Sequence, residues 1–381
     1  MTRDDMEQGK RRKKKRYYDY TLLFLVLFLV CFGMVMVYSV SYYNANKYYN
    51  DPTLFLRKQA IFGVAGTVLI VMISKIDYRI YVKKLPFLPM KPIFFLYLIC
   101  ILLQLYLVLF GDTTGGSQRW IELGSFGKFQ PSEISKICVL LLTAYLVKLA
   151  PGKLNSIKGF IRVMVIMAPL IALVVWENFS TALVMGVMMV AICFVASRKK
   201  GYYIAIAALL VVVAVLFIVL FPYRLERINV WRDIENHPKG YQILQGLYAI
   251  ASGGLFGKGL GQGVQKLGYI PEAHNDMIFS TICEELGLVG AFAVLFLFVL
   301  LLWRIFIIAI NAPDLFGSLI ATGVLAHIAV QVLINVAVVT NTIPSTGIPL
   351  PFISYGGSSL LVLMMEMGIV LNVSDRIEGE M

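Results

Sequence analysis

Ionisable residues gather around one point of the chain, in the stretch YIPEAHNDMIFSTICEELG, which contains Glu272, His274, Asp276, Glu284 and Glu285. Asp276 comes directly before a long apolar run, and the last two carboxylates lie inside it. Charged groups in a membrane segment are costly, and those that persist usually face a cavity. A carboxylate here could serve as a general base. The simpler interpretation is that Asp276 only favours the positive end of the helix that follows.

A second group of charges precedes another apolar run, in the stretch GSQRWIELGSFGKFQPSEISK. Arg119 and Lys128 lie before the run, and Pro131 is typical of a first helical turn. Lys136 falls inside the run, where an isolated cation is unfavourable, and Glu133 is the nearest carboxylate in sequence. These residues indicate either a salt bridge at a helix end or a cavity that accepts an anionic ligand.

The composition indicates that the segments that carry these residues lie in a membrane. Of the 381 residues, 59% are hydrophobic and only 15% are charged, so a water-soluble fold could not bury the apolar surface. We therefore expect an all-α polytopic membrane protein. Runs of about 20 apolar residues, each long enough to span a bilayer, occur near 20–41, 58–74, 88–110, 131–148, 160–176, 179–197, 202–222, 276–303, 316–340 and 354–373.

The distribution of Lys and Arg predicts the orientation of these ten spans. One side of the membrane collects 22 of the 34 basic residues, and the richer side is expected to be cytoplasmic. Both termini then lie inside, with a basic tail at 1–19, a ten-helix membrane domain at 20–373 and a short cytoplasmic tail at 374–381. The segments 111–131 and 223–275 become extracytoplasmic loops, and loops of this length commonly carry function.

Two short motifs have less specific explanations. The run KRRKKKR at 10–16 is compatible with nucleic-acid binding, but directly before a span it favours an orientation signal that contacts anionic lipid. The stretch GKGLGQG at 257–263 lacks the Lys-Ser/Thr ending of a phosphate-binding loop and follows no strand. We expect no nucleic-acid partner. The five cysteines all lie in apolar runs and are expected to be packing residues.

Three long stretches, in this order, resemble the SEDS family (shape, elongation, division and sporulation), which includes FtsW, RodA and SpoVE. They are GSQRWIELGSFGKFQPSEISK, GGLFGKGLGQGVQKLGYIPEAHNDMIFSTICEELGLVG and NTIPSTGIPLPFISYGGSSLL, and the resemblance covers nearly the whole chain. The ending is more similar to the FtsW and SpoVE branch. The family pattern PDLGTA is replaced here by ENFSTA, so Asn178 stands where an Asp is usual.

The resemblance implies a ten-helix fold with a large extracytoplasmic loop between helices 7 and 8. It also implies a peptidoglycan glycosyltransferase of the cytoplasmic membrane, which polymerises lipid II with inversion, in division or sporulation. The expected partners are a class B penicillin-binding transpeptidase and other division proteins. The essential acid of the family corresponds to Asp276, and the substrate-binding candidates are Arg119, Lys128, Glu133, Lys136, Glu272, His274, Glu284 and Ser354.

The chemistry assigns roles to these residues. Asp276 would accept the proton of a sugar hydroxyl that attacks an anomeric carbon. The leaving lipid diphosphate needs positive charge, which Arg119, Lys128 and Lys136 would supply, with a divalent cation (Mg²⁺ or Mn²⁺) as a candidate helper. Three alternatives stay open: a lipid II flippase, an elongation polymerase of the RodA type, and a non-catalytic scaffold.

Overall fold

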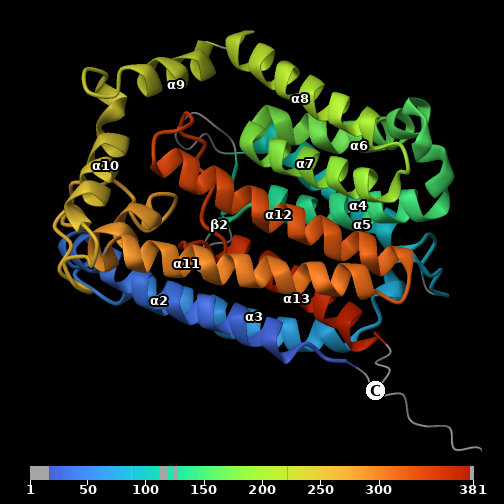
Figure 1. The fold of residues 1–381 in the computed structure, drawn as a ribbon, viewed down its shortest axis with the longest axis horizontal. Coiled ribbons are helices and arrows are strands. Elements are labelled where there is room, and N and C mark those ends of the chain that lie inside the picture. Colours follow the sequence, from blue (N-terminus) through green and yellow to red (C-terminus); the bar gives the residue numbers. More distant parts are fainter. Residues whose placement is uncertain (1–16, 87, 112–118, 123–127, 221, 378–381) are drawn as a thin grey trace, which may run out of the picture.

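The computed structural model describes residues 17–377 except 87, 112–118, 123–127 and 221. The described chain is a bundle of long helices with one two-stranded sheet (Figure 1). Long apolar runs form helices because a helix satisfies its backbone hydrogen bonds within the segment, as hydrocarbon requires.

Ten helices in the described ranges have 18 or more residues, and each corresponds to one predicted span. They are α2 (Tyr20–Tyr49), α3 (Leu54–Lys75), α4 (Pro92–Phe110), α5 (Pro131–Leu149), α6 (Ile157–Glu177), α7 (Phe179–Ala196), α8 (Lys200–Leu220), α11 (Ile278–Asn311), α12 (Leu315–Val339) and α13 (Gly357–Asp375).

Eight of these helices are long and apolar enough to cross a membrane. The other two are α5, which carries Glu133, Lys136 and Lys148, and α8, most of whose C-terminal half has side chains outside the described residues. The prediction of an all-α, multi-pass membrane protein is confirmed.

Shorter elements connect the long helices. They are η1 (Tyr78–Val82), β1 (Ile121–Glu122), β2 (Lys128–Phe129), η3 (Pro151–Asn155), α9 (Pro222–Arg232), η4 (Pro238–Gly240) and α10 (Tyr241–Gly253). The predicted loop 223–275 therefore contains two helices, and α10 packs against α11. The antiparallel pairing of β1 with β2 was not predicted.

Several helix ends differ from the predicted span limits, and two of the differences affect candidate residues. Helix α11 begins at Ile278, so Asp276 lies before the helix and not inside it. Helix α13 begins at Gly357, so Ser354 belongs to the preceding loop. Tight turns set both ends, and hydropathy alone does not detect them.

The connection between α12 and α13 folds back into the bundle. Phe352 and Ile353 of this connection are almost fully buried. They pack against α2 so closely that a Cβ at Gly33 would clash with their backbone. We call residues 340–356 the inserted loop. Irregular backbone is tolerated at such depth only where protein surrounds it or where it lines a cavity.

The bundle has two ends. Segments α9 and α10 lie at one end, here called the α10 end, and the end of α13 lies at the opposite end, here called the terminal end (Figure 1). The start of α11 and the inserted loop are both at the α10 end, so segments distant in sequence meet there.

Candidate functional site

Asp276 is held at the junction between a turn-rich loop and α11. Its backbone carbonyl accepts a hydrogen bond of 2.8 Å from the side-chain amide of Asn335 in α12. The same amide donates at 2.9 Å to the carbonyl of Ile348 in the inserted loop. One Asn335 side chain thus fixes Asp276 against the inserted loop.

The Asp276 carboxylate faces the inserted loop at Gly347. Its Oδ2 atom lies 4.0 Å from the position that a Cβ at Gly347 would occupy, and Gly347 has a φ of +71°, which favours glycine. The Asp276 side chain is half-buried, and within the described residues it forms no ion pair. A carboxylate with residual exposure and no fixed cation remains available to a ligand.

The pKa of Asp276 is raised to about 6, chiefly because of burial, and the nearby charge of Glu272 acts in the same direction. A backbone hydrogen bond and the charge of Arg227 act in the opposite direction. A general base works best when its pKa is near the operating pH. The environment of Asp276 therefore suits proton abstraction near neutral pH.

Side chains from two further helices hold the backbone of the inserted loop. Arg227 of α9 donates to the carbonyl of Ser345 at 2.9 Å, and Trp231 donates to that of Asn341 at 2.8 Å. Ser180, in the first turn of α7, donates to the carbonyl of Thr346 at 3.1 Å. These contacts bring α7 and α9 to the same short segment that faces Asp276.

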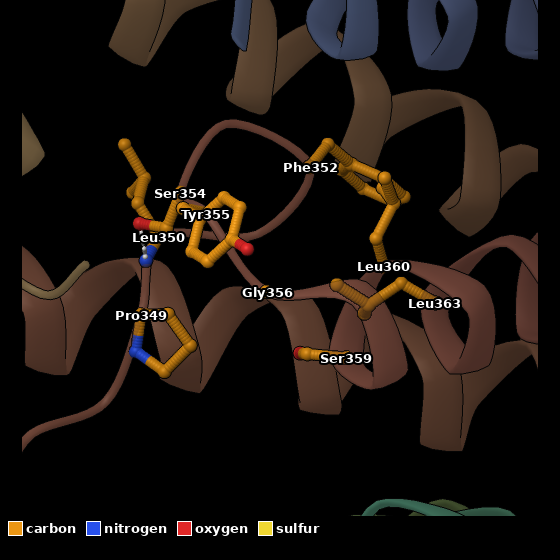
Figure 2. Close-up of a pocket in the computed structure, with 9 residues that line it drawn as sticks. All are labelled: Pro349, Leu350, Phe352, Ser354, Tyr355, Gly356, Ser359, Leu360 and Leu363. Atoms are coloured by element: carbon orange, nitrogen blue, oxygen red, sulfur yellow. Dashed lines mark hydrogen bonds between the residues drawn. The ribbon is translucent and has the colours of Figure 1, made fainter. Parts of the chain in front are cut away.

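His274 contacts the end of the inserted loop at Tyr355, the residue that follows Ser354. The His274 ring lies 5.3 Å from that of Tyr355 and 4.6 Å from that of Phe55, centroid to centroid. Burial lowers the pKa of His274, while Glu272 raises it. The Ser354 hydroxyl accepts a hydrogen bond of 2.8 Å from the amide of Leu350, beside a small pocket at the start of α13 (Figure 2). Ser354 therefore stabilises the loop turn.

A second polar group lies at the junction of α6 and α7. Arg119 donates to the carbonyl of Glu177 at 3.0 Å. With its amide oriented to suit its neighbours, Gln104 of α4 donates to both oxygens of the Glu177 carboxylate, at 2.7 and 3.0 Å. The same amide accepts from Ser135 of α5 at 3.2 Å. Because Ser180 follows this junction directly, the second group adjoins the inserted loop.

Lys136 forms the predicted pair with Glu133. The Lys136 Nζ and the Glu133 Oε2 are 2.9 Å apart, and both side chains are almost fully buried in the first turns of α5. The contact lacks hydrogen-bond geometry, which leaves Glu133 Oε2 without a hydrogen bond among the described residues. The pair is thus neutral overall and retains acceptor capacity.

Two further candidates lie on the surface. Lys128 of β2 is exposed and pairs with Glu122 of β1 at 3.2 Å. Glu272 is exposed, and its carboxylate accepts a hydrogen bond from Asn275. Neither is fixed by burial, and Glu272 affects the site through its charge on Asp276.

Glu284 has a different environment from the one expected of a substrate contact. It is fully buried, and its carboxylate pairs with Lys258 at 2.8 Å and accepts from the amide of Val264 at 2.9 Å. The adjacent Glu285 pairs with the buried Lys266 at 2.5 Å and accepts from Ser39 of α2. These carboxylates bind the glycine-rich segment 257–266 to α11, and donors from the protein itself occupy their oxygens.

Arg227 and Asn335 were missed by the sequence analysis. Arg227 stood among six basic residues of a long loop, and no motif distinguished it. Asn335 lies within an apolar helix, where a lone amide is a weak signal. Within the described ranges, no group of three or more His, Cys, Asp and Glu side chains is placed to hold a metal ion.

Comparisons with known proteins agree on one family. The family model for FtsW, RodA and SpoVE, described as "Cell cycle protein", matches residues 20–378. The chain is 35% identical to a probable peptidoglycan glycosyltransferase FtsW of Geobacter sulfurreducens, over 98% of this chain and all of the relative. It is 38% identical to stage V sporulation protein E of Bacillus subtilis, over 95% of this chain and 97% of the relative.

Two solved structures are similar over most of the chain. The rod shape determining protein RodA of Thermus thermophilus matches with a TM-score of 0.69 and 25% identity, over 95% of this chain and 98% of that one. A chain from a study of how a peptidoglycan synthase complex coordinates polymerization and crosslinking matches with a TM-score of 0.76 and 27% identity, over 94% and 97% of the two chains.

Proposed function

The chain belongs to the FtsW/RodA/SpoVE family, and from this premise we propose that it is a peptidoglycan glycosyltransferase that polymerises lipid II. The observation that carries the proposal is Asp276, a half-buried carboxylate with a pKa raised to about 6, fixed beside a loop that several helices hold in place. Relatives over nearly the whole chain bear the name of this activity.

The reaction is a single displacement. The 4-hydroxyl of one sugar attacks the anomeric carbon of another, and the bond from that carbon to the lipid diphosphate breaks. The hydroxyl proton passes to the Asp276 carboxylate, and the diphosphate leaves as an anion. A positioned base contributes typically about 10²–10⁴-fold to such a step. Attack opposite the leaving group inverts the anomeric centre.

The departing diphosphate needs positive charge that is already in place. Lys136 of α5 and Arg119 of the second polar group are two candidates, and a third is Arg227, whose charge lowers the pKa of Asp276. Lys136 is almost fully buried, and a cation in a water-poor site acts more strongly than one in solvent. We assign it to the diphosphate.

The proposed orientation places the α10 end outside the cell and both termini in the cytoplasm. It rests on the 22 of 34 basic residues that fall on the terminal side. The domains follow the sequence-based boundaries: a basic tail at 1–19, the membrane domain at 20–373 and a short tail at 374–381. Segments 111–131 and 223–275 are then extracytoplasmic.

Single cysteines test this orientation, in a background without the five native cysteines. Glu235, exposed between α9 and η4, is replaced by Cys, as is Gly152, which has open space around its Cβ position. In intact cells an impermeant thiol reagent should label only Glu235→Cys, and permeabilisation should expose Gly152→Cys. The reverse pattern would place Asp276 on the wrong side for lipid II polymerisation.

The cellular role proposed is division or sporulation, because relatives named FtsW and stage V sporulation protein E are similar over 95% or more of the chain. The partner proposed is a class B penicillin-binding transpeptidase, in line with the similarity to a chain studied within a peptidoglycan synthase complex.

The deciding experiment gives purified protein labelled lipid II in vesicles. Glycan chains are the expected product. Movement of lipid II across the bilayer without polymerisation would contradict the proposal and favour a flippase. If neither glycan chains nor movement of lipid II were observed, the remaining alternative would be a non-catalytic scaffold. The full chain should be tested with and without a transpeptidase partner, so that a requirement for the partner is not mistaken for inactivity.

A further inference from the structure

A pocket at the terminal end of the bundle is not used by the proposed reaction. It lies where α5 ends, around η3, and against the first turns of α6. Its apolar wall includes Leu149, Leu154, Val163 and Ile166, and its polar lining residues include Lys153 and Arg162. The cavity volume is about 80 Å³, and the pocket opens to the outside. It combines an apolar wall with two cations.

The two cations have no acidic neighbour to neutralise them. Both side chains are exposed, and among the described residues neither Lys153 nor Arg162 takes part in an ion pair. The sequence contains no Asp or Glu between Glu133 and Glu177, whereas Lys148 and Lys158 add further positive charge to this stretch. The pocket mouth is therefore strongly basic.

The backbone that carries the cations is rigidly held. The carbonyl of Leu154 accepts hydrogen bonds from Ser197 at 3.1 Å and from Tyr203 at 2.9 Å. The carbonyl of Lys153 packs against Gly159 so tightly that a Cβ there would clash with it. The turn is thus fixed both to α6 and to the connection between α7 and α8, which preorganises the pocket before any ligand binds.

The pocket lies near the end of an apolar span, where we expect a bilayer to change from hydrocarbon to head groups. Helix α6 is one of the apolar spans, and Arg162 lies about 8 Å along its axis from its first residue, Ile157, at 1.5 Å per residue. An Arg at such a position extends its head to the interface while its stem covers apolar surface. Exposed Ile157 and Ile161 continue the apolar wall on the same helix.

We propose that this pocket binds an anionic phospholipid, with its phosphate between Lys153 and Arg162 and part of an acyl chain against the apolar wall. Basic pockets between membrane helices recognise anionic head groups in this way. The charge complementarity favours this occupant over the chain's own N-terminal 16 residues, which carry eight basic residues and would be repelled. The proposal does not depend on the function proposed above.

Native mass spectrometry of the purified full chain tests the proposal, with phosphatidylglycerol or phosphatidylcholine added in detergent. Phosphatidylglycerol should bind more tightly than phosphatidylcholine. The double variant Lys153→Gln with Arg162→Gln should weaken phosphatidylglycerol binding about 25-fold, at about fivefold for each cation. Both side chains are exposed, so the thermal midpoint should stay unchanged.

A matched control removes two charges from the same end outside the pocket. Lys83→Gln with Lys84→Gln alters exposed cations that do not line the pocket, and should leave phosphatidylglycerol binding within about twofold of the parent. Equal losses in both double variants would mean unspecific attraction to the basic surface and would overturn the proposal. Unchanged binding in the pocket variant would overturn it as well.

A further pair of measurements separates a lipid from a soluble phosphate. Ala150→Trp enlarges a side chain of the pocket wall without changing charge, and should weaken lipid binding if an acyl chain enters. Glycerol 3-phosphate, which carries the phosphate without acyl chains, should fail to displace the lipid. Displacement by glycerol 3-phosphate, or full binding by a folded Ala150→Trp protein, would overturn the assignment to a lipid.

Discussion

Asp276 and Glu285 stand on either side of the start of α11 and have opposite environments. Glu285 is fully buried, and its oxygens are taken by Lys266, Ser39 and a backbone amide. Asp276 keeps partial exposure, forms no ion pair among the described residues, and has a pKa raised to about 6. The first carboxylate is satisfied by the protein, whereas the second is left for a ligand.

The difference separates structural charges from reactive ones. A buried carboxylate with several donors stabilises a fold by holding segments together, and breaking such a pair is strongly destabilising. A desolvated carboxylate without a cation is unfavourable for folding when ionised and is characteristic of functional sites. Variants of Glu285 should therefore change the stability of the fold, and variants of Asp276 should change the rate of polymerisation.

The largest effect is expected for Glu285→Ala. The change leaves Lys266, which is 4% exposed, without its partner and should lower the free energy of unfolding by about 3–5 kcal/mol. Thermal denaturation in detergent should show a large drop in midpoint. The double change Glu285→Leu with Lys266→Met should recover most of it, and a single variant with an unchanged midpoint would contradict the structural role.

Lys136→Met tests the buried pair of α5. If Lys136 contacts the diphosphate, polymerisation should fall by about 10²–10³-fold, as for loss of one preorganised electrostatic contact. The double variant Lys136→Met with Glu133→Gln also removes the negative charge that Glu133 would otherwise carry without a partner. This double variant should remain inactive. Activity restored in the double variant would mean that Lys136 only balances the charge of Glu133 and does not contact the diphosphate.

Asp276→Glu keeps the charge and lengthens the side chain by one methylene. The extra methylene moves the carboxylate away from its present position, which faces Gly347. We expect a loss of about 10²-fold in polymerisation rate at unchanged thermal stability, because a misplacement of about 1 Å has that effect. Glu235→Asp, an equally small change at an exposed carboxylate outside the site, is the matched control and should remain close to the parent rate.

The smallest effect concerns pH. The base must be ionised, so the rate should rise with pH through about 6 and then level off. Arg227→Gln removes a charge that lowers the pKa of Asp276, so the midpoint of this rise should move to higher pH. Arg232→Gln, at an exposed residue of the same helix, should leave the midpoint in place. A downward shift in Arg227→Gln would contradict the electrostatic account.

The sequence predicted the helices but not the contacts between them. Apolar runs of about 20 residues are sufficient to define the spans, because hydrocarbon imposes helix formation. The pairing of Lys136 with Glu133 was also predictable, since both lie on one helix face at a spacing of three. Local spacing carries such information directly.

Contacts between distant segments carry no such signal. Glu284 was predicted to bind substrate, but its partners come from a loop about 20 residues earlier, and Ser39 lies at the far end of the sequence from Glu285. Asn335 reaches Asp276 only because the inserted loop turns back into the bundle. Hydropathy treats that loop as a connection, so its role became visible only with the packing.

The central claim is that Asp276 is the general base, and Asp276→Asn tests it most directly. The change removes the base at nearly constant volume. Because the pKa of Asp276 is raised in the fold, ionisation opposes folding as the pH increases from about 4 through about 6. The variant should thus be at least as stable as the parent at pH 8. With labelled lipid II, the account predicts a folded Asp276→Asn protein that makes no glycan chains; glycan chains from that folded protein would contradict it.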